Sequence, residues 1–398
     1  MELLNGIIRA YPWGSRTLIP ALCGRPAPTE RPEAELWYGA HSAGPSQLAG
    51  SGRHLDAVVA ADPQATLGDR VAESFGGRLP FLVKILAADQ PLSLQAHPSL
   101  QQAREGFARE NEAGLAVDAA NRNYRDDNHK PEILIALTRF CAMAGFRPLD
   151  KTRELFAELD CPACERYLPM LEPGPDGEGD LRGLFTTWIT IPAEHRRQLI
   201  SAIVERAQAR GQVDDWIGGV LRTVVDLNKR YPGDVGVLGA LLLNHVTLNP
   251  GEAIYLDAGQ LHAYVQGMGV EIQSNSDNVL RGGLTSKYVD VPELVRVLRF
   301  DELDSPRVEP IARPTLAAGG LEYPVPVSDF SVTVARPGPF GWPLDHDGPV
   351  IALCTNGHAY CESAGTTLRI KSGEAVWIPA SDPLATLTGP GQVVAVSC

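Results

Sequence analysis

The chain has 398 residues, of which 44% are hydrophobic and 21% charged, and its formal net charge is −13. This length suggests two or three domains, and the acidic balance argues against a general nucleic-acid binder. Residues 1–6 do not resemble a signal peptide, no segment has the length and apolar character of a transmembrane helix, and the seven cysteines fit a reducing compartment. We therefore expect a cytoplasmic protein without membrane contact.

The first third of the chain predicts short strands between turns. Gly (39 residues) and Pro (32 residues) are frequent, which favours a large β component. Apolar runs over 35–40, 79–86 and 132–137 have the length of strands. Between them, 101–109 is typical of a short surface helix that ends near Gly114.

The pattern becomes helical at Asp150, where the sequence is typical of a capped helix. An amphipathic stretch follows Pro192, and an apolar stripe runs from Trp216 to Leu227, as in helix-packing cores. We therefore predict an all-α insertion domain over 150–234. Its Cys161 and Cys164 form a lone Cys-x-x-Cys pair, which indicates ordinary reduced cysteines more than a zinc knuckle or a redox pair.

Strands return from Val246 to the end of the chain. Short apolar runs near 330–334, 350–354, 375–378 and 393–396 are evenly spaced, which favours a sandwich or small barrel. Residues 249–256 also resemble 371–378, since both have a Gly-Glu turn that leads into an apolar strand. We interpret them as two copies of one β-barrel element. The predicted domains are therefore 1–149 with 235–310, 150–234, and 311–398.

Four polar side chains in apolar, strand-like surroundings are the candidate functional residues. They are Gln95, His97, Glu132 and His262. A buried polar group without a partner costs a few kcal/mol, and one bound metal ion would satisfy all four.

Strand periodicity supports a shared site, because residues i and i+2 lie on one face. This places Gln95 with His97 and Ser93, Glu132 with Lys130, and His262 with Tyr264. The two nitrogen and two oxygen ligands suit Zn²⁺, and Mn²⁺, Fe²⁺ or Co²⁺ less well. The alternative is that each histidine is a hydrogen-bonded core residue.

Longer motifs resemble a known family. The spacing Gly251-x5-Asp257-x-Gly259-x2-His262-x3-Gln266 resembles the second cupin motif, with Asp and Gln where Pro and Asn are commoner. The chain as a whole is similar to the type I phosphomannose isomerases. The segments that carry this resemblance are 11–15, 35–41, 92–98, 128–132 and 274–287. One departure is Leu100, where some relatives have a Lys, so no role is carried over to that position.

The resemblance implies a fold and a set of site residues. The fold would be mainly β, with two cupin-like β-barrels (jelly rolls) and an all-α domain, the C-terminal barrel lacking metal ligands. The implied ligands of one Zn²⁺ per chain are Gln95, His97, Glu132 and His262. The implied substrate-pocket residues are Lys84, Ser93, Tyr264 and Lys287. Arg281 would be the active-site arginine, and Lys130, His129 and Asp277 would lie near the chemistry.

The implied reaction interconverts D-mannose 6-phosphate and D-fructose 6-phosphate through a cis-enediol(ate). This reaction would feed mannose and GDP-mannose metabolism. Arg281 stays protonated, so its role would be to stabilise negative charge. Lys130, His129 and Asp277 are rival candidates for the base. Lys84, Lys287 and Ser93 are candidates for binding the phosphate, with Arg281 as a further possibility.

The partners and the alternative functions complete the prediction. We expect a small hexose phosphate as substrate, no nucleic-acid or membrane partner, and a monomer. Trp13 and Trp37 could shape the pocket mouth or belong to the core. The alternatives are a cupin-type isomerase of another hexose phosphate, an Fe²⁺ oxygenase, a non-enzymatic sugar-phosphate sensor and a purely structural β protein.

Overall fold

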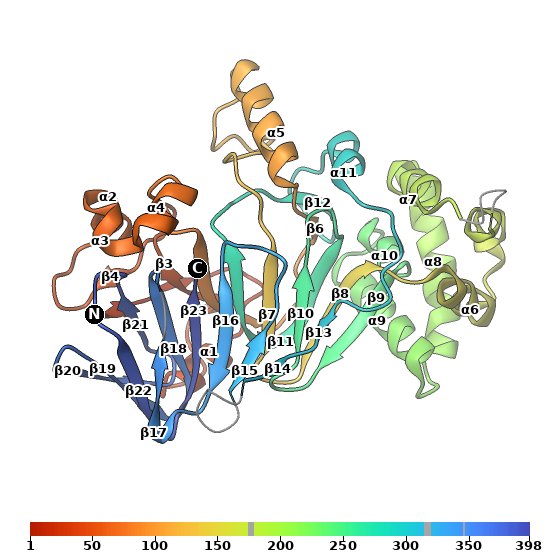
Figure 1. Ribbon diagram of the computed structural model, residues 1–398. Helices are drawn as coiled ribbons and strands as arrows, with labels where there is room; N and C mark the ends of the chain where they lie inside the picture. The colour runs from red at the N-terminus through yellow and green to blue at the C-terminus, as the bar shows by residue number, and fades with distance from the viewer. Residues whose placement is uncertain (174–178, 314–319, 345–346) are drawn as a thin grey trace.

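The computed structural model describes residues 1–173, 179–313, 320–344 and 347–398, and in these ranges the chain is mostly sheet. Figure 1 shows the strands at the centre and on one side, with most of the longer helices at the opposite end. None of the helices in the described ranges has both the length and the apolar character needed to cross a membrane.

The largest sheet has eleven strands and bends into two layers along β11 (His262–Ser274). The first half of β11 pairs with β6 and β8, and the second half pairs with β5 and β7. The other strands of this sheet are β2 (Ile7–Arg9), β3 (Glu35–Gly39), β5 (Phe81–Ala88), β6 (Leu94–Ala96), β7 (Glu132–Ala136), β8 (Phe140–Phe146), β9 (Leu243–Leu248), β10 (Ala253–Leu256), β12 (Leu280–Gly283) and β13 (Arg307–Val308).

Two further sheets belong mainly to the C-terminal part. The eight-stranded sheet runs in the order β14 (Ile311–Ala312), β15 (Leu321–Tyr323), β16 (Ser331–Ala335), β23 (Gln392–Ser397), β18 (Val350–Asn356), β21 (Ala375–Ile378), β1 (Glu2–Asn5), β4 (Gln47–Leu48). The four-stranded sheet runs β17 (Gly338–Leu344), β22 (Ala385–Gly389), β19 (His358–Ser363), β20 (Thr366–Lys371).

The two β-units share one strand order. We name the unit of the eleven-stranded sheet the first unit and that of the other two sheets the second unit. The central run β10-β7-β11-β5-β3 of the first unit corresponds to β21-β18-β23-β16-β15 of the second. The domain boundaries predicted from sequence place residues 1–149 in the first unit, but β1 and β4 belong to the sheet of the second unit. Strand β1 joins that sheet by pairing with β21, which lies more than 300 residues away in the chain.

The resemblance between 249–256 and 371–378 holds in three dimensions. Gly251 and Gly373 both have positive φ, +91° and +79°. The Glu252 carboxylate accepts from the Asn249 amide at 2.8 Å, and the Glu374 carboxylate accepts from the Lys371 amide at 2.9 Å. The two turns are thus the same element at matching places in the two units.

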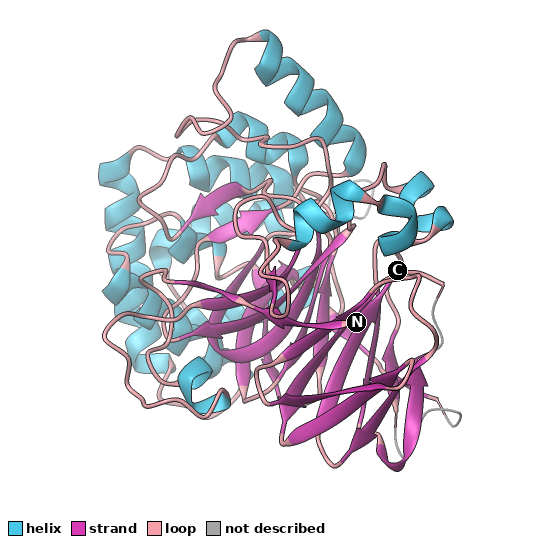
Figure 2. Cartoon of the chain, turned by 90° about the vertical axis from the view of Figure 1, so that its left-hand side faces the viewer, coloured by secondary structure: helices cyan, strands magenta, loops and turns pink. Residues whose placement is uncertain are grey.

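The cores explain why the strands are so apolar. On β5, Phe81, Val83 and Ile85 pack into the core between the two units, while Leu86 and Ala88 face the core inside the first unit. A strand covered on both faces needs mostly apolar residues, as predicted for 79–86, where Lys84 is the one charged residue among apolar neighbours. Figure 2 shows the strands fanned together beneath the helices.

Most of the longer helices come from one segment of the chain, between β8 and β9. Helix α5 (Leu100–Glu112) begins at a capping box formed by Ser99 and Gln102. Between β8 and β9 the described residues form only helices: α6 (Leu149–Leu159), η1 (Pro162–Leu171), α7 (Leu181–Thr190), α8 (Ala193–Arg210), α9 (Trp216–Arg230) and α10 (Gly236–Gly239). The remaining helices are α1 (Leu18–Leu22), α2 (Leu55–Ala61), α3 (Pro63–Leu67), α4 (Asp69–Ser74) and α11 (Val291–Val297).

Two details of the helical segment differ from the prediction. Asp150 is not the N-cap of α6, because the helix starts at Leu149 after Pro148 and has no side-chain cap. The segment also shares a core with the sheet, since Leu94 and Met143 pack among its apolar residues. The predicted apolar stripe of α9 is buried in this core, including Val220, Leu221 and Val224.

Candidate metal centre

Three buried side chains from three strands meet in the first unit. His97 follows β6, Glu132 begins β7 and His262 begins β11. Their ligand atoms all lie within 4.8 Å of one another. Glu132 lies between the two imidazoles, with Oε1 3.5 Å from His97 Nε2 and Oε2 3.6 Å from His262 Nε2.

The facing atoms lack hydrogen-bond partners. In the described residues, His97 Nε2, Glu132 Oε2 and His262 Nε2 are buried and make no hydrogen bond. Such atoms are costly unless something else satisfies them. Two ligand atoms on a tetrahedral zinc lie about 3.3–3.5 Å apart, given bonds of about 2.0–2.1 Å. The two spacings between Glu132 and the histidines are close to that value, and all three ligand atoms lie within 4.8 Å of one another, so this donor set fits a zinc ion.

Each imidazole is held through its other nitrogen. His97 Nδ1 lies 2.7 Å from the Asn278 carbonyl oxygen, and His262 Nδ1 lies 3.0 Å from that of Gln260. A carbonyl only accepts, so both Nδ1 atoms donate and both Nε2 atoms carry the lone pair that a metal needs. Burial lowers the pKa of His97, and burial together with the His97 ring lowers that of His262 to about 4, so both rings stay neutral.

Glu132 supplies the negative charge of the site. Burial alone would raise its pKa, but the Lys130 ammonium beside it outweighs burial and holds the pKa well below its ordinary value. Lys130 Nζ lies 2.7 Å from Glu132 Oε1. The carboxylate is therefore ionised and ready to bind a cation.

Gln95 belongs to the same region. In the pairing of β11, β6 and β12, His262 lies opposite Gln95 and Gln95 lies opposite Arg281. Directly opposed residues share one face of a sheet. The three side chains therefore form a row across the sheet, with Gln95 in a position to supply an amide oxygen beside His262.

A cavity of about 430 Å³ opens above these residues. Nearly all of the predicted pocket residues line it: Lys84, Ser93, Gln95, Lys130, Glu132, Tyr264, Asp277, Arg281 and Lys287. Trp13 and Trp37 line it as well, so both tryptophans belong to its wall. Larger cavities of about 710 and 580 Å³ occur elsewhere, but neither is lined by Glu132 or Gln95. His97 and His262 are buried beside Glu132 and do not line the 430 Å³ cavity themselves.

One end of the cavity carries unpaired positive charge. Arg281, Lys287 and Arg125 line it, and within the described residues none of them has an ion pair within 4.0 Å. Burial lowers the pKa values of Arg281 and Lys287, and the neighbouring cations lower them further. Clustered cations that no ion pair neutralises favour a bound anion.

The three candidate bases are not equally placed. Lys130 and Asp277 line the cavity, and Asp277 also lies 3.4 Å from His41 Nε2. His129 does not line it. Its Nε2 lies 2.9 Å from Asp329, on the other side of the strand. The alternation predicted for His129 and Lys130 therefore separates them.

Sequence reasoning missed several residues of the site. Glu271 is buried at 3% exposure and pairs with Lys84, and Arg125 joins the cationic end. The signal for Glu271 was present, because it interrupts an apolar strand between Val270 and Ile272 in the way that Lys84 interrupts β5. Arg125 lies in a polar loop and carries no comparable signal.

Comparisons with known proteins agree with this geometry. Residues 1–149 match the family model of the phosphomannose isomerase type I catalytic domain. The chain is 38% identical to the mannose-6-phosphate isomerase of Escherichia coli (strain K12) over 401 residues, covering 100% of this chain and 99% of that protein. It is 32% identical to mannose-6-phosphate isomerase 1 of Arabidopsis thaliana, covering 96% and 89% of the two chains.

Solved structures show the same similarity. A zinc-bound mannose 6-phosphate isomerase superposes with a TM-score of 0.89 at 35% identity, covering 100% of this chain and 98% of the other. A variant of the phosphomannose isomerase from Salmonella typhimurium gives a TM-score of 0.89 at 35% identity, with 100% and 99% coverage.

Proposed function

The chain belongs to the type I phosphomannose isomerase family, and from this premise we propose that it is a zinc-dependent isomerase of D-mannose 6-phosphate and D-fructose 6-phosphate. One observation carries the proposal: in the described residues, three buried ligand atoms without hydrogen-bond partners cluster together, and their carboxylate residue, Glu132, lines a cavity that also holds cations without an ion-pair partner. The relatives named above are mannose-6-phosphate isomerases, and one of them is zinc-bound in its crystal structure.

His97, Glu132 and His262 would hold one zinc ion, with Gln95 as the fourth ligand. Two neutral imidazoles, a carboxylate and an amide suit Zn²⁺ in a catalytic site that keeps a position open. When bound, the ion supplies a Lewis acid for the substrate oxygens. The second unit is expected to be structural, because Val350 and Ile378 pair where the first unit has Glu132 and Leu256.

Arg281 is placed to stabilise negative charge during isomerisation. A cis-enediol(ate) develops charge on O1 and O2 when a proton moves between C1 and C2. A guanidinium stays protonated and can donate several hydrogen bonds to such oxygens. Its place beside Gln95 in the row across the sheet brings it close to the metal ligands.

Lys130 and Asp277 are the candidates for moving the proton, since both line the cavity and His129 does not. Burial raises the pKa of Asp277, but His41 and Lys130 outweigh this and lower it, so the carboxylate is ionised and able to accept a proton. Lys130 bonds to Glu132 and can hold a substrate hydroxyl beside the metal ligands.

The phosphate is assigned to the cationic end, with Lys287, Arg125 and Arg281 opposing its charge and Ser93 as a hydroxyl donor. Lys84 and Tyr264 line the inner wall, where Lys84 already has a carboxylate partner. Lys84 is therefore assigned to the sugar end.

The proposal extends to the fold. We assign both β-units to the cupin fold and the segment 150–234 to a helical insertion domain. The role in mannose metabolism, the monomeric state and the cytoplasmic location stay predictions.

Removing the metal tests the proposal. We expect that chelation abolishes turnover of mannose 6-phosphate, and that one equivalent of Zn²⁺ per chain restores it, because the three ligand atoms have no hydrogen-bond partner in the part of the chain that the structure describes. The measurement is the rate of fructose 6-phosphate formation before chelation, after it and after zinc is returned. Turnover that survives complete metal removal would refute the mechanism.

Arg281→Ala separates an enzyme from a sugar-phosphate sensor. The variant is expected to keep its zinc and to lose about 10²–10³-fold in kcat, the usual cost of a lost oxyanion donor. A parent protein that binds zinc but turns over no member of a hexose-phosphate panel would support the sensor.

A further inference from the structure

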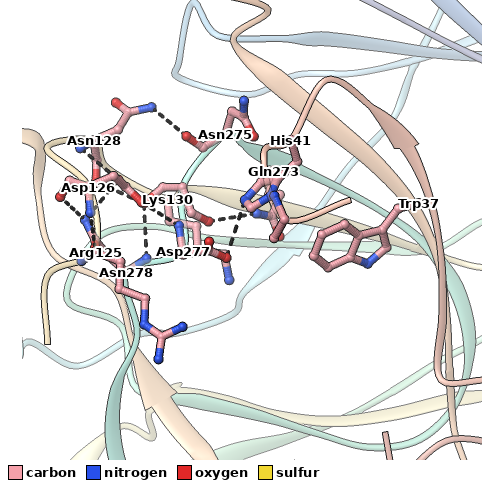
Figure 3. A network of polar contacts seen from close by, with 12 residues as sticks. Trp37, His41, Arg125, Asp126, Asn128, Lys130, Gln273, Asn275, Asp277 and Asn278 are labelled. Carbon is pink, nitrogen blue, oxygen red and sulfur yellow. Dashed lines mark hydrogen bonds and ion pairs between the residues drawn. The ribbon is translucent and has the colours of Figure 1, made fainter. Parts of the chain in front are cut away.

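A clamp of polar contacts joins two loops beside the metal centre. The loop 125–128 leads into Lys130 and Glu132, and the loop 275–278 leads into β12 and Arg281. Figure 3 shows Asp126 and Asn278 at the centre of the contacts between them. The side chains that form it belong to no proposed ligand or catalytic residue, and Arg125 and Asp277 take part only through their backbone amides, so the mechanism above leaves it unexplained.

The clamp is reciprocal. The Asp126 carboxylate, on the first loop, accepts from the Ser276 hydroxyl at 2.7 Å and from the Asp277 amide at 2.7 Å. The Asn278 carboxamide, on the second loop, donates to the carbonyl oxygens of Asp126 at 2.8 Å and Asn128 at 2.9 Å. It also accepts from the Arg125 amide at 2.7 Å.

Asn278 is fully buried, so its side-chain amide has to find its hydrogen-bond partners within the protein. The side-chain amide has two donors and one acceptor oxygen, and all three are used. No other side chain except aspartate has its shape, and aspartate would lose both donors and face the Asp126 carboxylate. The position therefore requires asparagine for its bonding and not merely for its volume.

The backbone of Asn278 connects the clamp to the metal centre. Its carbonyl oxygen is the atom that accepts from His97 Nδ1 at 2.7 Å. That bond determines which imidazole nitrogen keeps a lone pair, and it sets the direction of Nε2. We propose that Asp126 and Asn278 are positioning residues that hold the Asn278 carbonyl in place and thereby fix the tautomer and orientation of His97.

The inference rests on the proposed zinc site, but the state of His97 can be measured without metal. In metal-free protein labelled with ¹⁵N-histidine, His97 of the parent is expected to be the Nδ1–H tautomer. In Asn278→Ala and in the milder Asp126→Asn, the His97 signals are expected to shift toward a mixture of tautomers. Zn²⁺ affinity, measured by competition with a chromophoric chelator, is expected to fall about 10–100-fold.

Asn128→Ala is the matched control. The Asn128 side chain also joins the two loops, because its amide donates to the Asn275 carbonyl at 3.3 Å. Asn278 bonds to the backbone carbonyl of Asn128, which the substitution keeps. This variant is expected to keep the parent tautomer and to stay within about twofold of the parent affinity. Thermal unfolding of each metal-free variant reports whether it is folded.

The outcomes separate the two proposals. If the folded Asp126→Asn and Asn278→Ala variants keep the parent tautomer and the parent Zn²⁺ affinity, the clamp has no positioning role. If Asn128→Ala loses as much affinity as they do, the effect is general loop loosening and the inference fails. If the parent itself binds no zinc, the proposed function fails, while the tautomer signals still decide the inference.

Discussion

At the scale of single residues, Lys84 shows what a buried charge requires. It is 5% exposed on β5, and its Nζ lies 2.7 Å from Glu271 and bonds to Gln273. Burial alone would lower its pKa, but the carboxylates of Glu271, Glu35 and Glu132 outweigh burial and raise it. Lys84 is therefore a fixed cation whose main partner lies within the protein.

This pairing predicts a large stability effect. Lys84→Met would leave Glu271 as a buried charge without a partner and is expected to lower the free energy of unfolding by about 3–5 kcal/mol. The double variant Lys84→Met/Glu271→Gln is expected to recover part of the loss. Urea unfolding of the metal-free proteins measures both.

Lys151→Met is the control, because it breaks the exposed ion pair with Glu154. It should leave the urea midpoint unchanged. If Lys84→Met also leaves the midpoint unchanged, the buried pair does not stabilise the first unit.

At the scale of elements, the two Gly-Glu turns place β10 and β21 in the same way. Each turn needs glycine because its φ is positive. Their surroundings differ. A Cβ on Gly251 would meet nothing within 4 Å, whereas a Cβ on Gly373 would lie 2.4 Å from Cys23 Sγ.

These turns predict two graded effects. Gly251→Ala is expected to cost about 1–2 kcal/mol, the price of a left-handed residue with a side chain. Gly373→Ala should cost more, because Cys23 must also move. Chemical denaturation measures both, and equal costs would contradict the role of Cys23. Gly219→Ala within α9 is the control and is expected to stabilise the helix by about 0.5–1 kcal/mol.

At the scale of the whole molecule, the two units hold each other through equivalent bonds. Tyr38 on β3 donates to the carbonyl of Gly373 in the second unit, and Tyr323 on β15 donates to that of Gly251 in the first, at 2.7 Å. Strands β3 and β15 occupy matching places in the two sheets. Each Gly-Glu turn is thus anchored by a tyrosine of the other unit, across the apolar core between them.

Removing either hydroxyl should loosen the assembly of the units. Tyr38→Phe and Tyr323→Phe are each expected to cost about 1–3 kcal/mol, because the carbonyl of a buried glycine (Gly373) or a partly buried one (Gly251) loses its donor. Amide hydrogen exchange should rise at the turn that faces the substituted tyrosine. Tyr360→Phe, at an exposed site, is the control. Unchanged exchange at Gly251 in Tyr323→Phe would show that the bond does not hold that turn.

How much could be predicted from sequence depends on how local the signal is. Gln95 with His97, and Lys130 with Glu132, follow from the two-residue repeat of a strand. In the structure Gln95, Lys130 and Glu132 line one cavity, and His97 clusters with Glu132. The helical run, the strand lengths and the repeated Gly-Glu turn are local patterns of the same kind. The resemblance to the type I phosphomannose isomerases then predicted that these separate residues belong to one site.

Tertiary structure alone decided the partners. Lys84 pairs with Glu271 about 190 positions away, and His129 contacts Asp329, 200 positions away. Strand β1 joins the sheet of the second unit by pairing with residues more than 370 positions away. The sequence by itself determined which side chains are available, because alternation and apolar context are written along the chain. Which of them meet depends on how the sheets fold over one another, and that is set by burial of the shared cores rather than by any neighbouring residue.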